Sequence, residues 1–521
     1  MPLRSTSRGK CTRAIPLLVS AFLALMGASW LMATPPGSSF DEQAHFVKAI
    51  AVGHGDFYGE PPVVTAANLR DLYRGGAGAL AELHRSQTTS AVRWQNRTTR
   101  RFQVPPNLID PRFGCTVWNR GQPATCLNGP RPRTDARTQN TYAGTYQPYL
   151  YLPAGLATRS AGSPGTALRL ARAATLAVAL ALLIAAVWLL WAPEAGATSL
   201  LGLVAALTPM VVFISSVVSP SGPEIAGAVC FSAALLRLGR DRPPPPWLWI
   251  ALGASGCVLA AARALGPAFI ALAVVSIAAL IGPRRLARRI RAGGKAPAAA
   301  GVAIAIAATA SLVWEFRYQP RPSPSGSSAL DALDPSLSNL PSVAQEAIGN
   351  FGSLDVPMPA FTYVLWAALV VVLGVTALVV GDSRDRLSLA GLVAAAVAVT
   401  IVMSVVYREI GPLHGRYAMP FLVLVPLWEG ELVLRHRADL RADVLRALGA
   451  TVFGAAAIVQ LVGWWASARR FAVGTEGSWL FTGAAMWSPP LGWWPWLALA
   501  VLAAAAYAAV AVAAVRLPAR A

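Results

Sequence analysis

A short polar stretch after the first hydrophobic segment carries the residues best suited to chemistry. It runs P-P-G-S-S-F-D-E-Q-A-H-F-V-K from Pro35 to Lys48. Asp41 and His45 are four residues apart, so they share one face of a helix. Adjacent carboxylates at a hydrocarbon boundary acquire raised or split pKa values, which suits a general base or a cation ligand. We therefore predict a catalytic group of Asp41, Glu42 and His45.

The same stretch also has a purely structural explanation. Ser39 and Glu42 have the S-x-x-E spacing of a capping box, which predicts that a helix begins here. Acidic side chains in a first turn stabilise a helix through its dipole, without any chemistry. No cysteine or histidine cluster has metal-ligand spacing. No cofactor is therefore required by a motif, and a divalent cation held by Asp41 and Glu42 stays an alternative.

The composition indicates a membrane protein. The chain of 521 residues is 55% hydrophobic, with a mean hydropathy of +0.51. This is more apolar surface than a soluble fold can bury, so the chain is predicted to be an all-α polytopic protein of the plasma membrane. The formal net charge is +20. Its arginines lie in short loops between apolar segments, a pattern that orients a membrane protein and attracts lipid headgroups, so no nucleic-acid partner is expected.

Charge and hydropathy divide the chain into three parts. Residues 1–34 are predicted to be a cytoplasmic tail and a first transmembrane helix, because a basic tail precedes a long apolar run. Residues 35–146 are predicted to form an extracytoplasmic loop with amphipathic helices inside 67–85. Residues 147–521 form a multi-span domain with a second outer loop at about 315–357. Its apolar segments lie at 167–191, 198–218, 222–237, 247–262, 265–282, 297–314, 359–380, 387–407, 418–434, 447–466 and 493–515.

The number of spans follows less directly. The arginine-rich segments 284–291 and 435–446 are predicted to be cytoplasmic. Counting crossings backward from 284 disagrees by one with counting forward from the first span. A half-span or a re-entrant helix at 147–160 explains the difference. We therefore predict 11 to 13 transmembrane helices, with the amino terminus in the cytoplasm.

Two of the five cysteines, Cys115 and Cys126, lie in the predicted outer loop. An oxidising exterior would join them in a disulfide. The alternative is a pair of free loop thiols.

This topology places a set of polar residues at the outer ends of the spans, beside the acidic corner. They are Glu224, Arg263, Arg408, Glu409, His414 and Arg416. Charges at membrane depth are costly and usually face a cavity, so their gathering on one side predicts a site. Arg263 could instead extend to the interface, and Arg408 could form an exposed ion pair with Glu409.

Tyrosines mark the point where the chain enters the membrane again. Tyr146 and Tyr149 lie in Y-Q-P-Y-L-Y-L-P, as expected of an interfacial aromatic belt. They join a set of substrate-binding candidates made up of Arg263, Arg408, His414, Arg416, Tyr146 and Tyr149.

The combination indicates a reaction class. A carboxylate can take a proton from a hydroxyl, while arginines hold a phosphate whose charge grows as it leaves. A lipid-linked phosphosugar meets both demands, because its polyprenyl tail can lie in a groove between spans. Sugar nucleotides are cytoplasmic, and the sequence has no nucleotide-binding loop.

Several motifs together resemble a known family. They are T-P-P-x4-D-E-x-x-H-F, Y-Q-P-Y-L-Y-L-P, T-P-M-V-V-F-I-S-S-V-V-S-P-S-G, R-A-L-G-P and H-G-R-Y-A-M-P. The chain from about Pro35 to Pro426 resembles a bacterial, actinobacterial-type polytopic membrane family catalogued as a domain of unknown function. That family is similar in layout to the GT-C glycosyltransferases.

The resemblance implies transfer of a sugar from a polyprenyl-phosphate donor to a glycan or glycolipid acceptor outside the membrane. It implies that Asp41 is the base, with Glu42 as its partner or as a cation ligand. Arg416 and Arg263 would bind the donor phosphate. Where an N-P-D motif is expected the chain has Ser219-Pro-Ser, so the displaced Glu224 is assigned no catalytic role.

Two alternatives use the same residues. A transporter or flippase of lipid-linked saccharides would bind headgroups with these arginines and would not need Asp41 as a base. A non-catalytic subunit of envelope assembly would use the outer loop to bind a partner.

Overall fold

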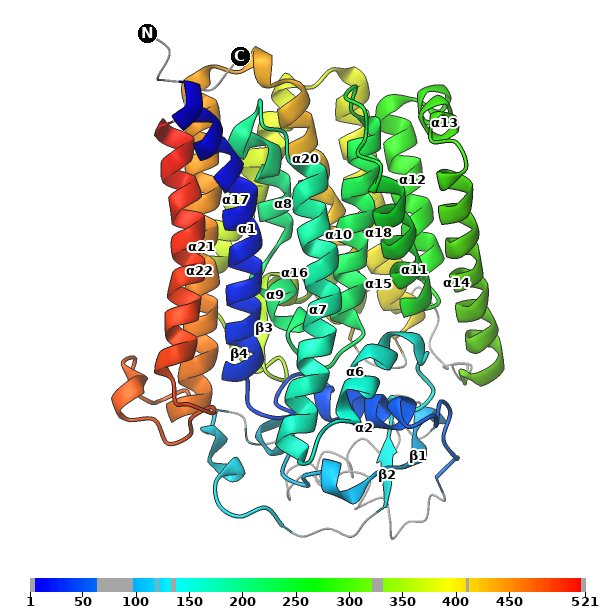
Figure 1. Ribbon diagram of the computed structural model, residues 1–521, viewed down its shortest axis with the longest axis vertical. Coiled ribbons are helices and arrows are strands. Elements are labelled where there is room, and N and C mark those ends of the chain that lie inside the picture. The colour runs from blue at the N-terminus through cyan, green and yellow to red at the C-terminus, as the bar shows by residue number, and fades with distance from the viewer. Residues whose placement is uncertain are drawn as a thin grey trace.

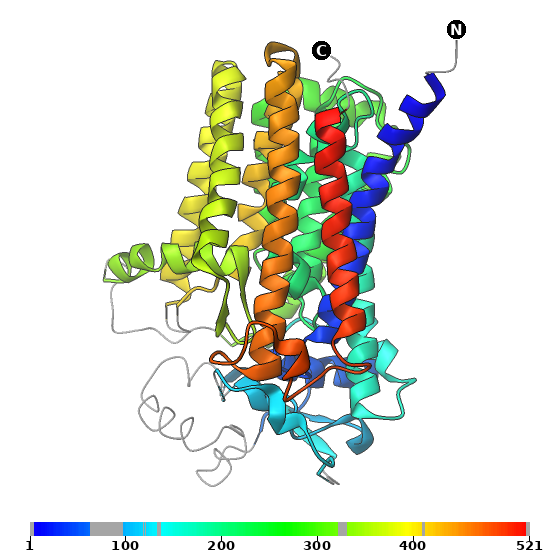
Figure 2. The same cartoon turned by 90° about the vertical axis from the view of Figure 1, so that its left-hand side faces the viewer.

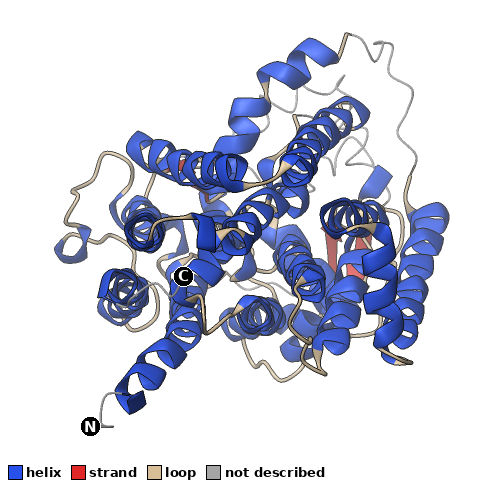
Figure 3. Ribbon diagram, turned by 90° about the horizontal axis from the view of Figure 1, so that it is seen from above, coloured by secondary structure: helices blue, strands red, loops and turns tan. Residues whose placement is uncertain are grey.

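The computed structural model describes residues 5–62, 97–117, 119, 121–132, 137–320, 331–408 and 412–516. Its long helices run side by side in one bundle (Figure 1), and most of them are seen nearly end-on from above (Figure 3). The described chain begins and ends at the same end of the bundle, which we call the termini end. The opposite end, which we call the loop end, carries the segments between the first two long helices.

Every predicted apolar segment forms helix. Eight helices of the described residues are long and apolar enough to cross a membrane. They are α1 (Ser5–Ala33), α7 (Pro164–Leu190), α14 (Ala296–Tyr318), α17 (Ala360–Val380), α18 (Ser383–Val406), the run of α19 (Gly415–Leu422) and α20 (Leu424–Arg435), α21 (Ala442–Val473) and α22 (Trp494–Arg516).

Two further candidates are bent. The stretch of η5 (Gly196–Leu200) and α8 (Leu201–Ala206) meets α9 (Pro209–Ser215) at 69°. Helix α12 (Gly266–Ile281) meets α13 (Pro283–Ala292) at 108°. Proline begins the second helix of each pair, where it lacks the amide hydrogen that a continuous helix would need.

The described residues therefore hold 8 spans, or up to 10 if each bent pair counts as one. The predicted number of 11 to 13 is not confirmed, because three of the predicted segments do not count as spans. Helix α10 (Ser221–Gly239) carries charged residues and is buried along its whole length, and α11 (Leu248–Ala262) has only 15 residues. The segment 147–160 forms η4 (Tyr149–Tyr151) and α6 (Leu152–Thr158), which lie at the loop end beside α2 rather than across the bundle (Figure 1).

The loop end is built from short elements. Helix α2 (Glu42–Gly53) packs against α6, and strands β1 (Arg100–Gln103) and β2 (Thr138–Thr141) pair antiparallel. Strands β3 (Asn350–Phe351) and β4 (Val356–Pro357) form a second pair. The remaining helices of the described residues are α15 (Leu333–Ser338), α16 (Leu340–Gly349), η1 (Pro106–Leu108), η2 (Cys115–Val117), η3 (Ala124–Leu127) and η7 (Phe481–Gly483), together with η6 (Arg437–Asp439), which follows α20 at the termini end. The predicted amphipathic helices within 67–85 lie outside the described residues.

The connection between α21 and α22 lies against the loop-end segments (Figure 2). The Thr475 amide donates to the Gly121 carbonyl at 2.8 Å, and the Asn128 side chain donates to the Met486 carbonyl at 3.0 Å. The last two helices therefore brace the segment that contains the predicted disulfide.

Candidate functional site

Helix α2 begins where the sequence predicts, but not through a capping box. Its N-cap residue is Asp41, which has a φ of 59° and makes no side-chain cap bond. Asp and Asn tolerate this left-handed conformation better than other non-glycine residues. Ser39 Oγ is buried without a hydrogen-bond partner in the described part of the chain. Because the Asp41 carboxylate makes no cap bond, it is available to other groups.

The Asp41 carboxylate is bound by two side chains from distant parts of the sequence. Arg416 Nη2 donates to Oδ2 at 2.6 Å, and the Tyr142 hydroxyl donates to Oδ1 at 2.5 Å. Burial raises the pKa of the Asp41 carboxyl, but the charge of Arg416 and the hydrogen bond from Tyr142 lower it more. The net pKa lies below its usual range, so Asp41 is ionised at neutral pH.

Arg416 is held over aromatic rings. Its guanidinium carbon lies 3.8 Å from the centroid of the Phe40 ring, and Nη2 also donates to the Tyr417 hydroxyl at 3.0 Å. Cation–π contacts fix a guanidinium while leaving some donors free for an anion. The arrangement joins the start of α2 to the start of α19.

Arg263 approaches the same place from the turn between α11 and α12. Its Nε donates to Glu224 Oε2 at 2.9 Å, and Nη2 donates to Ser221 Oγ at 2.8 Å. Its guanidinium carbon lies 4.3 Å from the centroid of the Tyr417 ring. Tyr417 therefore lies between the two predicted phosphate-binding arginines, and Glu224 orients one of them.

A cavity of about 250 Å³ lies at the junction of the bundle and the loop end, and Asp41, Arg263 and Tyr417 line it. Arg416 is not part of the lining and lies directly behind it, bonded to Asp41 and Tyr417. The polar wall of the cavity includes Asp41, Arg263 and His414, and its apolar wall includes Phe269 and Met403. The other lining residues are Phe40, Thr98, Tyr142, Tyr146, Gln147, Tyr151, Pro220, Ala262, Ala264, Leu265, Glu315, Gln319, Tyr407, Pro412 and Leu413. One cavity thus offers ionised groups and an apolar surface from the span ends.

His45 does not line this cavity but holds a residue that does. Its Nδ1 lies 2.7 Å from the Tyr151 hydroxyl, and the side chain is buried. Burial lowers the pKa of the His45 imidazole to about 3, against the raising effect of Asp41. The ring is therefore neutral at neutral pH, and it positions Tyr151.

Glu42 is turned away from the cavity. Its carboxylate is fully buried and pairs with Arg172 of α7 at 2.6 Å. It also accepts hydrogen bonds from the Gly37 amide and the Val218 amide, each at 3.1 Å. Arg172 in turn donates to the Leu31, Thr34 and Pro35 carbonyls at the end of α1. Glu42 thus joins α1, α2 and α7, and the predicted partnership with Asp41 is replaced by a structural role.

The other predicted binding residues divide into two groups. His414 lines the cavity, and its Nδ1 lies 3.5 Å from Glu346 Oε2. Tyr146 also lines it, but Tyr149 does not, because its hydroxyl donates to the Ala310 carbonyl of α14 at 3.0 Å. Arg408 is not part of the lining and donates to the Val405 carbonyl at 2.8 Å. Glu409, predicted as its ion-pair partner, lies outside the described residues.

The alternative of a cation held by Asp41 and Glu42 is not supported by their positions. Each carboxylate has its own arginine, Arg416 for Asp41 and Arg172 for Glu42. In the part of the chain that the structure describes, no three His, Cys, Asp or Glu side chains are grouped so that they could hold a metal ion.

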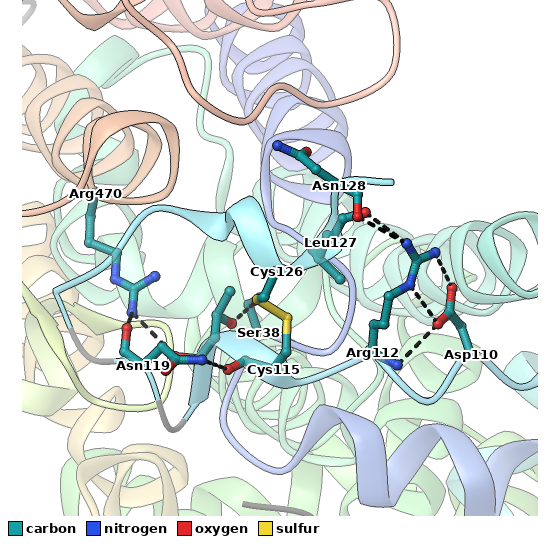
Figure 4. The surroundings of a disulfide bond; sticks show 10 residues. Ser38, Asp110, Arg112, Cys115, Asn119, Cys126, Leu127, Asn128 and Arg470 are labelled. Carbon is teal, nitrogen blue, oxygen red and sulfur yellow. Dashed lines mark hydrogen bonds and ion pairs between the residues drawn. A yellow bond between two sulfur atoms is a disulfide. The ribbon is translucent and has the colours of Figure 1, made fainter. Parts of the chain in front are cut away.

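The predicted disulfide between Cys115 and Cys126 is confirmed (Figure 4). It closes the segment that lies against the residues before Asp41. There the Thr116 hydroxyl donates to Ser38 Oγ at 2.5 Å, and the Gly114 amide donates to the Pro36 carbonyl at 3.2 Å. The disulfide therefore braces the turn that presents the acidic corner.

Three important residues were missed by the sequence reasoning. Tyr142 has no local signal, because only the fold brings it to Asp41, whereas Tyr417 directly follows Arg416 in G-R-Y. Lys48 is fully buried and donates to the Phe57 and Gly144 carbonyls at 2.6 and 2.7 Å. Burial lowers the pKa of the Lys48 amine to about 7. Through these two hydrogen bonds, the Lys48 side chain connects α2 to the loop-end segments.

A model of the family DUF2142, described as predicted membrane protein, matches residues 23–425. The chain therefore belongs to this family. No curated protein and no solved structure matches it. The match contains the whole segment from Asp41 to Arg416.

Proposed function

We propose that this integral membrane protein is a glycosyltransferase that moves a sugar from a polyprenyl-phosphate donor to a cell-envelope acceptor outside the plasma membrane. The observation that carries the proposal is the cavity that presents Asp41 and Arg263 together with an apolar wall. A lipid-linked phosphosugar has the matching parts, namely an anion, a polar sugar and a hydrocarbon tail.

In the proposed reaction, Asp41 takes the proton of the acceptor hydroxyl while the hydroxyl oxygen of the acceptor forms a bond to the anomeric carbon of the sugar. The bond between that carbon and the phosphate oxygen breaks, and polyprenyl phosphate leaves. Arg263 and Arg416 stabilise the charge that grows on the leaving phosphate. The first isoprene units lie against Phe269 and Met403.

The pairing of Asp41 with Arg416 gives the donor a second effect. The phosphate of the sugar donor competes with Asp41 for this guanidinium, because both are anions that accept hydrogen bonds from the same N–H groups. Losing the cation raises the pKa of the Asp41 carboxyl towards the range of an effective base. Binding of the sugar donor thus activates Asp41 as a base. Without the donor, Asp41 stays paired with Arg416 and is a weak base.

Orientation follows from charge. The arginine-rich helix α13 and the region after α20 lie at the termini end (Figure 1), which the positive-inside rule assigns to the cytoplasm. The cavity then opens on the extracytoplasmic side, where the lipid-linked donor and the acceptor are both available. The charges of this cavity lie at the ends of spans, which favours transfer over the alternative of transport across the membrane.

The test is sugar transfer in vesicles that contain the full chain and a radiolabelled polyprenyl-phosphate sugar. Wild type and the control Glu60→Gln, whose side chain is 72% exposed in a surface ion pair, should both form labelled glycan. Asp41→Asn should form little. Movement of donor between leaflets without any labelled product in wild type would instead establish the flippase alternative.

A further inference from the structure

A second and larger cavity lies at the opposite end of the bundle. It has a volume of about 700 Å³ and is lined by the final residues of α7, α10 and α20, by the segments that follow each of them, including η6, and by the start of α13. These elements meet at the termini end (Figure 1). It shares no residue with the cavity at Asp41.

The lining of this cavity is strongly basic. It contains six arginines and three carboxylates. The arginines are Arg237, Arg240, Arg242, Arg285, Arg435 and Arg437, and the carboxylates are Glu194, Asp241 and Glu431. The excess of positive charge attracts an anion, and guanidinium geometry favours phosphate oxygens.

The carboxylates do not satisfy this charge. Glu431 alone is shared by Arg240 at 2.7 Å and Arg435 at 3.1 Å. Among the described residues, no carboxylate lies within ion-pair distance of Arg237 or Arg437. Arg237 donates to the Arg242 and Pro243 carbonyls, and Arg437 Nη1 donates to the Leu434 carbonyl.

Two guanidinium nitrogens here also lack hydrogen bonds. Arg435 Nη2 and Arg437 Nε are buried and have no partner in the described part of the chain. A buried donor without a partner costs about 1–3 kcal/mol, and more when it is charged. A phosphate in the cavity is the kind of acceptor that would remove this cost. Both arginines belong to the lining residues of the cavity, and Arg435 Nη2 lies 3.2 Å from where a Cβ at Gly239 would stand.

Tryptophans complete the wall on the side of the membrane surface. Trp188 and Trp247 are 41% and 37% exposed, and Trp191 is half-buried. Indole rings prefer the interface between headgroups and hydrocarbon, so they locate the cavity at headgroup depth. An occupant with a phosphate and an attached apolar part fits these surroundings better than a free ion.

We propose that this cavity binds the phosphate of an anionic phospholipid from the leaflet at the termini end. The guanidinium groups of Arg435 and Arg437 contact the phosphate oxygens, and Trp188 and Trp247 pack against the glycerol and the upper acyl chains. This lipid site is independent of the proposed sugar transfer.

The test is native mass spectrometry of the purified full chain with phosphatidylglycerol or phosphatidylcholine of the same acyl chains. Wild type should bind phosphatidylglycerol more tightly, and inorganic phosphate should not displace it at equal concentration. Arg437→Gln should weaken phosphatidylglycerol binding by about fivefold, the effect of about 1 kcal/mol for one basic contact. The matched control Arg288→Gln removes an exposed charge from α13 at the same end and should change binding less than twofold.

Three results would overturn the proposal. Equal weakening by both substitutions would mean that the lipid responds only to surface charge. Equal affinity for phosphatidylcholine, measured with the same preparation, would exclude recognition of an anionic headgroup. Displacement of the lipid by equimolar inorganic phosphate would assign the cavity to a free anion. Unchanged phosphatidylcholine binding by Arg437→Gln serves as the check that the variant is folded.

Discussion

Two adjacent carboxylates at the start of α2 form ion pairs of the same length in very different surroundings. Asp41 meets Arg416 at 2.6 Å with 19% of its side chain exposed, and Glu42 meets Arg172 at 2.6 Å with none exposed. The first pair faces a cavity and the second is sealed among helices. The difference teaches that an ion pair can serve chemistry only where a substrate can reach and compete with it.

The largest expected effect separates the two carboxylates by stability. Glu42→Gln leaves Arg172 as an uncompensated buried charge, which costs about 3–5 kcal/mol. Asp41→Asn should cost less than half as much, because position 41 lines the cavity and is 19% exposed, so water can reach the place where the charge is lost. Thermal unfolding in detergent measures both. Equal losses would break the distinction between a sealed pair and an open one.

Loss of the disulfide should affect the Asp41–Arg416 pair more than the Glu42–Arg172 pair. Cys115 and Cys126 are 11 residues apart, and a cross-link of this length contributes about 2–3 kcal/mol. Replacing both by serine should lower the unfolding temperature and weaken donor binding, because the braced segment supports the turn before Asp41. Wild type treated with a reductant provides the comparison. An unchanged unfolding temperature would show that the cross-link does not constrain this turn.

Arg416→Gln tests the cavity-facing ion pair of Asp41 and Arg416 by removing the arginine instead of the carboxylate. Losing one charged phosphate contact should weaken donor binding by about 10- to 100-fold. Arg101→Gln, which removes a partly exposed arginine of the loop end, should have little effect. Equilibrium binding of a labelled donor to the purified chain measures this. Similar losses in both variants would indicate general electrostatic attraction rather than a contact in the cavity.

The smallest effect concerns His45 and pH. Its folded pKa of about 3 lies below the unfolded value of 6.5, so between these pH values the unfolded chain binds more protons. Stability is therefore fully present above pH 6.5 and falls as the pH decreases towards 3, by at most about 1.4 kcal/mol per pH unit. His45→Gln should flatten the unfolding temperature between pH 6.5 and 5. The exposed His54→Gln should not. An unchanged slope in the His45 variant would contradict this origin.

The helical bundle could be predicted from hydropathy, because each apolar run is long enough to indicate a membrane helix. The number of spans could not, since α10 is a buried helix with charges and 147–160 is too short to cross. Arg263 and Arg416 could be predicted because charged side chains at membrane depth are costly, so several of them on one side indicate a site.

The division between Asp41 and Glu42 could not be predicted from spacing. Asp41 is the N-cap in a left-handed conformation while Glu42 is the first residue of α2, and the partner of each carboxylate lies more than 100 residues away. Tyr149 and Arg408 were predicted from their positions at the ends of the predicted spans, and both donate to backbone carbonyls outside the cavity.

The most direct test of the account is the single-turnover rate of sugar transfer at saturating donor for wild type and Asp41→Asn. The exchange keeps the shape of the side chain and removes the base. We predict that the rate falls by about 10²- to 10⁴-fold, the usual contribution of a general base, while the donor binds at least as tightly, because asparagine competes less with the phosphate for Arg416. A rate equal to that of wild type, with the same donor affinity, would contradict base catalysis by Asp41.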